Sequence, residues 1–224
     1  MASLPSTTND VSILSHAVLD HVYNITSKKH LDTATCFQEH TEQYLPASKY
    51  TISSFNQSEL DDLSNVYHKL FPALFEHNPV YLPQTYERML SITINGQKFK
   101  SDQFVCARSV FSFSDREAVP SLMTLRTVFT DPDVRPAKIH YFFVHSIKIS
   151  SSELSSHPFA FVSWPMRHPL HSSIGKPFEV WCSSLYENCT ANCFVPLNYI
   201  VSPLLTAQQV FEGENVLVTV PLIS

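Results

Sequence analysis

Two close pairs of residues have the chemistry of zinc ligands. His168 and His171 are separated by two residues, and Cys189 and Cys193 by three. Imidazole nitrogens and thiolate sulfurs complete a zinc tetrahedron when such pairs face each other. Here the histidine pair precedes the cysteine pair and no glycine-rich knuckle accompanies either, which fits ordinary loop and core residues as well. A zinc-stabilised domain is therefore the weakest of three hypotheses on function.

No pattern in the sequence predicts catalysis. Cys182 would need a base to act as a nucleophile, and the candidates are His157, His168 and His171. No catalytic signature surrounds this cysteine, and Trp181 beside it favours a buried thiol in a strand. The neighbouring carboxylates at positions 61 and 62, and at 212 and 214, are typical of solvated surfaces, and three isolated glycines cannot form a phosphate-binding loop. We expect a protein that is not an enzyme and needs no cofactor.

Four aromatic residues could line a pocket for a cation such as methyl-lysine. They are Tyr141, Trp164, Trp181 and Tyr186. The alternative is that the same rings fill the core, which is the commoner place for large aromatic residues on the strands of a small domain. The sequence alone leaves both interpretations open.

Several arginines could contact nucleic-acid phosphates, although the chain as a whole is acidic. Its net charge is −5 and its isoelectric point is near 6.1, whereas a dedicated nucleic-acid binder usually has a basic face. Small barrels do bind single strands by stacking bases on aromatic rings that are flanked by basic side chains. The residues that could supply phosphate contacts are Arg108, Arg116, Arg126, Arg135 and Arg167.

The sequence predicts an intracellular protein that does not associate with a membrane. Its first residues lack a charged segment followed by an apolar one, and no apolar run approaches the roughly 20 residues of a membrane span. The five cysteines are an odd number and are not densely spaced, which favours reduced thiols. A role in chromatin or transposition would place the protein in the nucleus.

The clearest predicted element is a helix from Gln57 to Phe71. Asn56 is a good N-cap, and Glu59 three residues later completes a capping box. Phe55 and Leu60 hold the positions of a hydrophobic staple on either side of this cap. Apolar residues then recur every three or four positions, which predicts one buried face.

From position 91 onward the pattern is that of β-strands. Asn95-Gly96 between two alternating segments predicts a hairpin, because a type I′ turn needs positive φ at both central residues. Ile139, Tyr141 and the following odd-numbered residues alternate with a second apolar set, which predicts a long central strand. Pro196 demotes its strand to an edge or a bulge. Further strands are predicted at 104–113, 159–164, 178–182, 194–201 and 215–222.

These elements predict a mainly β protein, a small β-barrel with one or two N-terminal helices that is α+β overall. Three parts are expected along the chain. Residues 1–50 form an arm with a short helix over Val11 to Tyr23, residues 51–90 form a helical segment and linker, and residues 91–224 form the barrel.

Several blocks resemble uncharacterised open reading frames of transposable elements in animal genomes. The blocks are RPAKIHYF from Arg135, HPFAFVSW from His157, GKPFEVWC from Gly175, FVPL from Phe194 and GENVLV from Gly213. With the predicted helix included, the resemblance spans about residues 50 to 222. Such frames often lie beside genes for helicases or transposase-like enzymes, which implies a transposition enzyme as a partner.

A more distant resemblance is to bromo-adjacent homology domains, which are chromatin-binding β-barrels. It rests on VSW at 162–164, RHP at 167–169, SLY at 184–186 and VPLNYI at 195–200. The resemblance implies a barrel and a histone partner, but no acidic or aromatic cage of that family maps onto these residues. A shared fold would not by itself give the function.

The leading hypothesis is a non-enzymatic interaction module of a mobile-element-derived protein. It would bind a protein or peptide partner, such as a histone tail in chromatin or a transposition enzyme. The second hypothesis is a nucleic-acid-binding accessory domain of a transposition complex.

Overall fold

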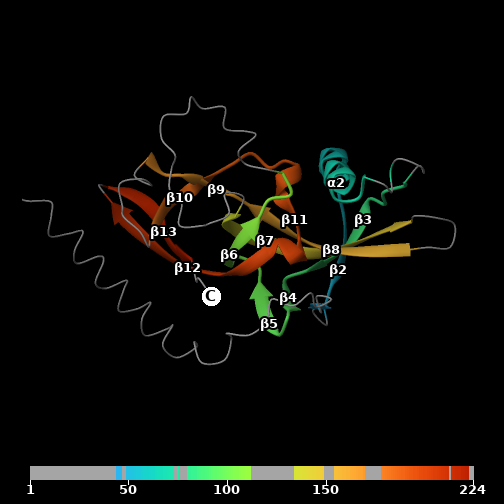
Figure 1. Ribbon diagram of the computed structural model, residues 1–224, viewed down its shortest axis with the longest axis horizontal. Coiled ribbons are helices and arrows are strands. Elements are labelled where there is room, and N and C mark those ends of the chain that lie inside the picture. The colour runs from blue at the N-terminus through green and yellow to red at the C-terminus, as the bar shows by residue number, and fades with distance from the viewer. Residues whose placement is uncertain are drawn as a thin grey trace, which may run out of the picture. The chain divides into compact units, whose positions relative to one another are not determined.

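The computed structural model describes residues 44–46, 49–72, 75, 80–111, 134–148, 154–169, 178–211 and 213–221 (Figure 1). These residues form a mainly β protein with one α-helix, which confirms the predicted class. None of their helices is both long and apolar enough to cross a membrane. The predicted helix over Val11 to Tyr23 lies outside the described residues, as does most of the predicted arm. The elements are β1 (Tyr44–Pro46), β2 (Thr51–Ser54), α2 (Gln57–Leu70), β3 (Thr85–Met89), β4 (Ser91–Ile94), β5 (Gln97–Lys100), β6 (Phe104–Arg108), β7 (Val134–Lys148), β8 (Leu154–Ser163), β9 (Pro165–Arg167), β10 (Glu179–Tyr186), η2 (Ala191–Cys193), β11 (Phe194–Pro196), η3 (Leu197–Tyr199), β12 (Ile200–Phe211) and β13 (Glu214–Pro221).

The strands form one large and one small antiparallel sheet. The large sheet follows the order β11-β8-β7-β6-β12-β13-β10-β9, with β3 paired to β7 and β2 paired to β3. The small sheet has the order β1-β4-β5. In the part of the chain that the structure describes, the path of the large sheet ends at β11 and β9, and no pairing joins these two strands. A closed barrel therefore stays a prediction.

Strand β7 organises the large sheet because it pairs with three other strands. Its first half lies against β6, its second half against β3, and β8 follows its other edge. The register with β8 shifts between Ile139 and Tyr141, which places His140 in a bulge. Ala137 and Ile139 thus share a core with Phe142, so the alternation predicted from Ile139 onward is wrong across this point. The extra residue turns the odd-numbered side chains to the opposite face.

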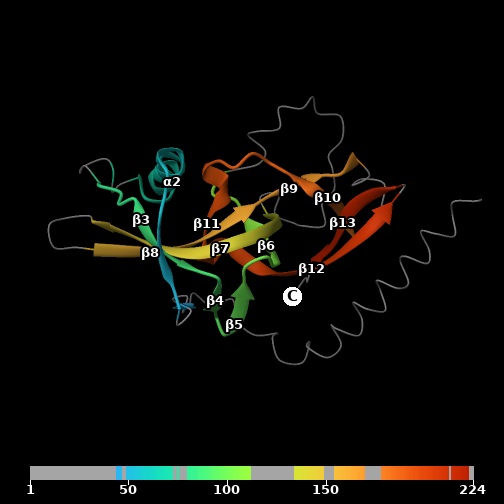
Figure 2. The ribbon, with the colours of Figure 1, turned by 180° about the vertical axis from the view of Figure 1, so that it is seen from behind.

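Two apolar clusters cover the opposite faces of β7 and β8. We call the first the hairpin-side core, because it joins β7 and β8 to the β4–β5 hairpin; its large members include Ile92, Phe99, Ile139, Phe142 and Trp164. The second is the helix-side core, which lies under α2. Its members include Phe55, Leu63, Val66, Tyr67, Tyr86, Phe143, Phe159 and Phe194. Both views of the ribbon place α2 beside β3, β8 and β11 (Figures 1 and 2).

The local signals for α2 and the hairpin are confirmed in detail. The side chain of Asn56 accepts a hydrogen bond from the Glu59 amide at 2.9 Å, and the Glu59 carboxylate accepts one from the Asn56 amide at 2.8 Å. The helix ends at Leu70, one residue before the predicted end. In the hairpin turn, Asn95 and Gly96 have φ of 48° and 79°, as a type I′ turn requires.

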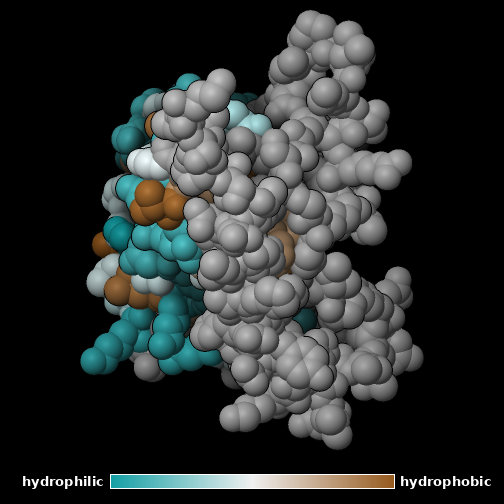
Figure 3. All heavy atoms as spheres, turned by 90° about the vertical axis from the view of Figure 1, so that its left-hand side faces the viewer, coloured by the Kyte–Doolittle hydropathy of each residue, from teal (hydrophilic) through white to brown (hydrophobic). Residues whose placement is uncertain are grey.

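Some strands differ from the prediction because their apolar patterns are weak. β2 and β3 form within residues 51–90, where the sequence predicts a helix and a linker. β12 continues to Phe211, well beyond its predicted end, with mostly half-exposed side chains. Figure 3, which views the molecule from the side of β12 and β13, shows apolar side chains standing singly among polar ones where the surface is coloured. Isolated apolar residues of this kind are ordinary on a protein surface.

Candidate functional site

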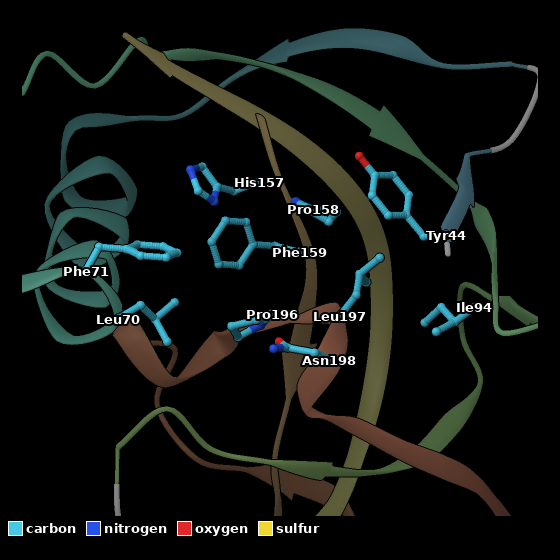
Figure 4. A pocket seen from close by; sticks show the side chains of 10 residues that line it. All are labelled: Tyr44, Leu70, Phe71, Ile94, His157, Pro158, Phe159, Pro196, Leu197 and Asn198. Carbon is cyan, nitrogen blue, oxygen red and sulfur yellow. The ribbon is translucent and has the colours of Figure 1, made fainter. Parts of the chain in front are cut away.

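A pocket of about 240 Å³ lies between the C-terminal end of α2, β8 and η3 (Figure 4). Figure 4 shows Phe71, His157 and Phe159 gathered on the helix side of the pocket, with Tyr44 and Ile94 on the opposite side. Most of the lining is apolar, and none of the described residues that form it is Asp, Glu, Lys or Arg. The lining residues are Tyr44, Leu70, Phe71, Ile94, His157, Pro158, Phe159, Pro196, Leu197 and Asn198.

The pocket lies at a strand edge that is only partly covered. β11 pairs with residues 159–161 of β8 and then ends, because η3 begins at Leu197. Within the described residues, the first half of β8 therefore has β7 on one edge and no strand on the other. Pro196 lacks an amide hydrogen, so it cannot extend the ladder along β8. A side-chain pocket thus lies next to main-chain groups at an unpaired edge.

His157 contributes an imidazole ring to the pocket wall. Its Nε2 atom lies 2.9 Å from the Ser155 hydroxyl, and its ring centre lies 4.9 Å from that of Phe71. Burial lowers the pKa of His157, so its imidazole is uncharged at neutral pH. The exposed amide of Asn198 and the hydroxyl of Tyr44 add polar groups at the rim. The site as a whole is neutral and suits an uncharged, largely apolar group.

A buried polar network behind the pocket fixes α2 to the sheet. The His145 Nε2 atom donates a hydrogen bond to the Pro83 carbonyl at 2.7 Å, because a carbonyl oxygen can only accept. The neutral ring therefore accepts at Nδ1, where the Tyr67 hydroxyl donates at 3.0 Å. Burial lowers the pKa of His145, and the Pro83 carbonyl partly opposes this effect. His145 is the cross-strand partner of His157, so the network lies directly beside the pocket.

The four predicted cage aromatics do not form a surface cage. Trp164 and Tyr141 belong to the two opposite cores, and the Trp164 indole donates to the Asn192 carbonyl at 3.0 Å. Trp181 is 1% exposed, and only Tyr186 is half-buried. The large aromatic rings fill the interior, as the alternative interpretation expected, because packing against neighbouring strands buries most of their area.

The predicted phosphate-binding arginines have different environments. Arg135 is buried, forms an ion pair with Glu187 and donates to the Pro165 carbonyl at 3.2 Å. The guanidinium groups of Arg135 and Arg167 lie 5.4 and 5.9 Å from the ring centre of Trp181. Arg108 is exposed at the end of β6, while Arg116 and Arg126 lie outside the described residues. Arg135 therefore lies in the interior, and of the three described candidates only Arg108 is exposed.

The predicted zinc ligands do not come together among the described residues, where no cluster of three or more metal-binding side chains is found. His168 lies 3.1 Å from the Glu214 carboxylate, and His171 lies outside the described residues. Cys189 is exposed and Cys193 is buried, and both thiols are free. Cys182, considered above as a nucleophile, donates weakly to the Arg167 carbonyl at 3.7 Å, and burial raises its pKa.

The pocket is hard to predict from the sequence, because its walls come from five separate segments. The available signals were the prolines at 158 and 196, which mark strand edges, and the end of the predicted helix near Phe71. No protein-family model matches the chain, and neither a curated protein nor a solved structure matches it. The resemblances to transposable-element frames and to bromo-adjacent homology domains therefore stay predictions.

Proposed function

We propose that the chain is a non-enzymatic interaction module that binds an extended peptide segment of a protein partner. The pocket between α2 and β8 is the observation that carries this proposal. A bulky apolar side chain of the partner enters the pocket, and the flanking peptide lies along the uncovered edge of β8. A partner in chromatin or in a transposition complex, as the resemblances imply, fits the same mode of binding.

The size of the pocket favours a side chain over a cofactor. Pockets for drug-sized ligands usually measure about 300 to 1,000 Å³, whereas this one measures about 240 Å³. The lining offers Phe71, Phe159 and Leu197 as apolar contacts, and His157 and Asn198 as uncharged polar groups. Peptide-binding proteins commonly combine such an anchor pocket with a free strand edge.

The same lining disfavours a phosphate-bearing ligand. Nucleic-acid sites depend on Lys and Arg for contacts with the backbone, and neither residue type occurs among the described residues that line this pocket. Arg135, a buried member of the candidate arginines, is paired with Glu187. The nucleic-acid hypothesis therefore remains the alternative outcome of the binding experiment.

The proposal is tested by panning the full chain against a random peptide library displayed on phage. We expect the enriched peptides to share one bulky apolar residue in an otherwise extended sequence. Asn198→Phe places a large ring at the rim of the pocket and should weaken these peptides. Excluding one buried aliphatic side chain costs about 2 kcal/mol, or roughly thirtyfold in Kd.

Asn65→Phe is the matched control, because it makes the same change on the exposed face of α2 and Asn65 does not line the pocket. Fluorescence anisotropy should give wild-type affinity for this variant. The proposal fails if no motif is enriched, or if both Asn→Phe variants bind equally well. It also fails if single- or double-stranded DNA binds tightly with a steep dependence on salt and Asn198→Phe has no effect on that binding.

A further inference from the structure

The wall of the pocket on the helix side is made of flat rings. His157 and Phe159 lie two residues apart on β8, so their side chains stand on the same face of that strand. The ring centres of His157 and Phe71 are 4.9 Å apart. Figure 4 shows these three rings close together, with Tyr44 on the opposite side of the pocket. A further ring from a partner could therefore pack against them in the offset or edge-to-face arrangements that aromatic side chains prefer.

Within the described residues, the imidazole of His157 uses only one of its two nitrogen atoms. The Nε2 atom lies 2.9 Å from the Ser155 hydroxyl, and no described residue forms a hydrogen bond with the Nδ1 atom. Contacts with the rings of Tyr67 and Phe71 fix the orientation of the imidazole, which is half-buried in the pocket wall. The Nδ1 atom is therefore a polar group with which a ligand could pair, and a ligand that covers it without pairing would bind less well.

The group that pairs best with this nitrogen can both donate and accept a hydrogen bond. The Ser155 hydroxyl can accept from Nε2, which makes Nδ1 an acceptor in the neutral ring, or it can donate to Nε2, which makes Nδ1 a donor. A tyrosine hydroxyl serves in both cases, whereas the indole N–H of tryptophan serves only in the first. Phenylalanine and leucine fill an apolar space but leave Nδ1 without a partner.

The charge of the lining narrows the choice further. Neither acidic nor basic residues occur among the described residues that line the pocket. A charged side chain that entered would lose its hydration without meeting an opposite charge, and this loss is costly. The anchor must therefore be uncharged, with an aromatic body for the ring walls and a hydroxyl for the imidazole. Tyrosine meets these requirements together, and its phosphorylation would remove the fit because it adds a charge of about −1.5 to −2 at neutral pH.

We propose that the anchor residue of the partner is a tyrosine whose hydroxyl pairs with the Nδ1 atom of His157. This inference rests on the proposed function, because it names the side chain that enters the pocket. His157 then determines specificity, since it separates tyrosine from phenylalanine, which has the same ring. The rings of Phe71 and Phe159 supply the apolar contacts that both side chains share. An unphosphorylated tyrosine in an extended peptide is thus the class of ligand that the site takes.

The first test compares anchor residues in one enriched peptide, with the wild-type full-length chain and fluorescence anisotropy. We expect tyrosine to be the residue that the enriched peptides share. Its replacement by phenylalanine should raise Kd about fivefold, because one hydrogen bond is lost, and its phosphorylation should abolish measurable binding.

The outcomes of this test separate the tyrosine anchor from the proposed function. Enriched peptides that share leucine or phenylalanine and respond to Asn198→Phe would overturn the tyrosine anchor and leave the proposed function intact. Equal affinities for the tyrosine and phosphotyrosine peptides would also overturn the tyrosine anchor. The absence of any shared residue among the enriched peptides would overturn both.

The second test determines whether His157 is the source of the preference for tyrosine. His157→Phe keeps a flat ring but removes both nitrogens, so the tyrosine and phenylalanine peptides should bind this variant with equal Kd. His68→Phe is the matched control and should keep the preference, because His68 is exposed on α2 and does not line the pocket. Long-range proton–nitrogen NMR spectra of the wild-type chain decide the question if His157→Phe folds poorly. The Nδ1 signal of His157 should shift more with the tyrosine peptide than with the phenylalanine peptide. Equal shifts, or a preference for tyrosine that survives in His157→Phe, would overturn the proposal.

Discussion

Replacement of Tyr67 by phenylalanine should destabilise the protein through one buried nitrogen atom. The Tyr67 hydroxyl lies 3.0 Å from the Nδ1 atom of His145, and both residues are fully buried. The Nε2 hydrogen of His145 is already used by the Pro83 carbonyl, which fixes Nδ1 as an acceptor. Tyr67→Phe keeps the ring but leaves this acceptor unsatisfied. A buried unsatisfied polar group costs about 1 to 3 kcal/mol in the free energy of unfolding.

The effect should depend on pH, with a sign that follows from His145. Burial lowers the pKa of His145 below the unfolded value of 6.5, so the unfolded state binds more protons as the pH falls below that value. The wild-type free energy of unfolding therefore decreases in acid. In Tyr67→Phe the neutral imidazole of His145 no longer accepts the Tyr67 hydrogen bond, so the pKa of His145 rises back toward 6.5. The free energy of unfolding of this variant therefore decreases less in acid than that of the wild type. Burial also lowers the pKa values of His157 and His140, but these two residues reduce the free energy of unfolding in acid equally in both proteins.

Urea unfolding followed by tryptophan fluorescence measures both effects. The free energy of unfolding is extrapolated to zero urea at about pH 8 and about pH 5. We expect the difference between the two proteins to be largest at the higher pH. Tyr186→Phe is the matched control, because its hydroxyl is half-buried and donates at 3.4 Å to the Ser183 carbonyl, so its loss should cost little. Equal losses for the two variants, or a difference that grows in acid, would refute the argument.

Three further substitutions test the elements that position the pocket, and the same unfolding assay measures each. Asn56→Ala removes the cap of α2 and should cost about 1 kcal/mol, whereas Asn56→Ser keeps an acceptor and should cost less. Gly96→Ala puts a side chain at a φ of 79° with nothing within 4 Å of its Cβ, so backbone strain alone should lower the free energy of unfolding by about 1 kcal/mol. Gly96→Asn should lower it by less, because asparagine tolerates positive φ better than alanine. Equal losses for the two variants would contradict backbone strain as the cause. Trp164→Phe creates a small cavity and removes the indole donor of the Asn192 carbonyl, and it should lower the free energy of unfolding by about 2 to 3 kcal/mol. An unchanged free energy of unfolding would contradict the burial of Trp164.

The features that the sequence predicted well are those set by neighbouring residues. The capping box needs only Asn56 and Glu59, and the hairpin turn needs only Asn95 and Gly96. Each of these signals has a local geometric cause that no distant residue can easily override. Pro196 is a similar case, because a missing amide hydrogen confines it to the margin of a sheet, and among the described strands β11 is the last one on its side.

The features that the sequence did not predict depend on contacts between distant segments. The bulge at His140 is a single extra residue, and apolar side chains on both faces of β7 hide the change in alternation. β12 is held by main-chain pairing with β6 and β13. Its side chains alternate between half-buried and exposed from Leu205 to Phe211, but Gln209 is half-buried and Val210 is exposed, so the residue types do not reveal this alternation. The aromatic residues were ambiguous for a related reason, since a ring suited to a cage is equally suited to a core. Only the topology decides between these two places.

The pocket follows from where two elements stop. α2 ends at Leu70, and β11 ends at Pro196 after covering only three residues of β8, so the space beyond both ends is left open beside His157. Pro158 stands in the uncovered half of β8 and has no amide hydrogen to offer a partner strand. A continuous ladder of main-chain hydrogen bonds along this edge is therefore disfavoured, which protects the edge from indiscriminate pairing. In the proposed complex, recognition then depends on the side chain that fills the pocket, so a substitution at Asn198 tests the proposal directly.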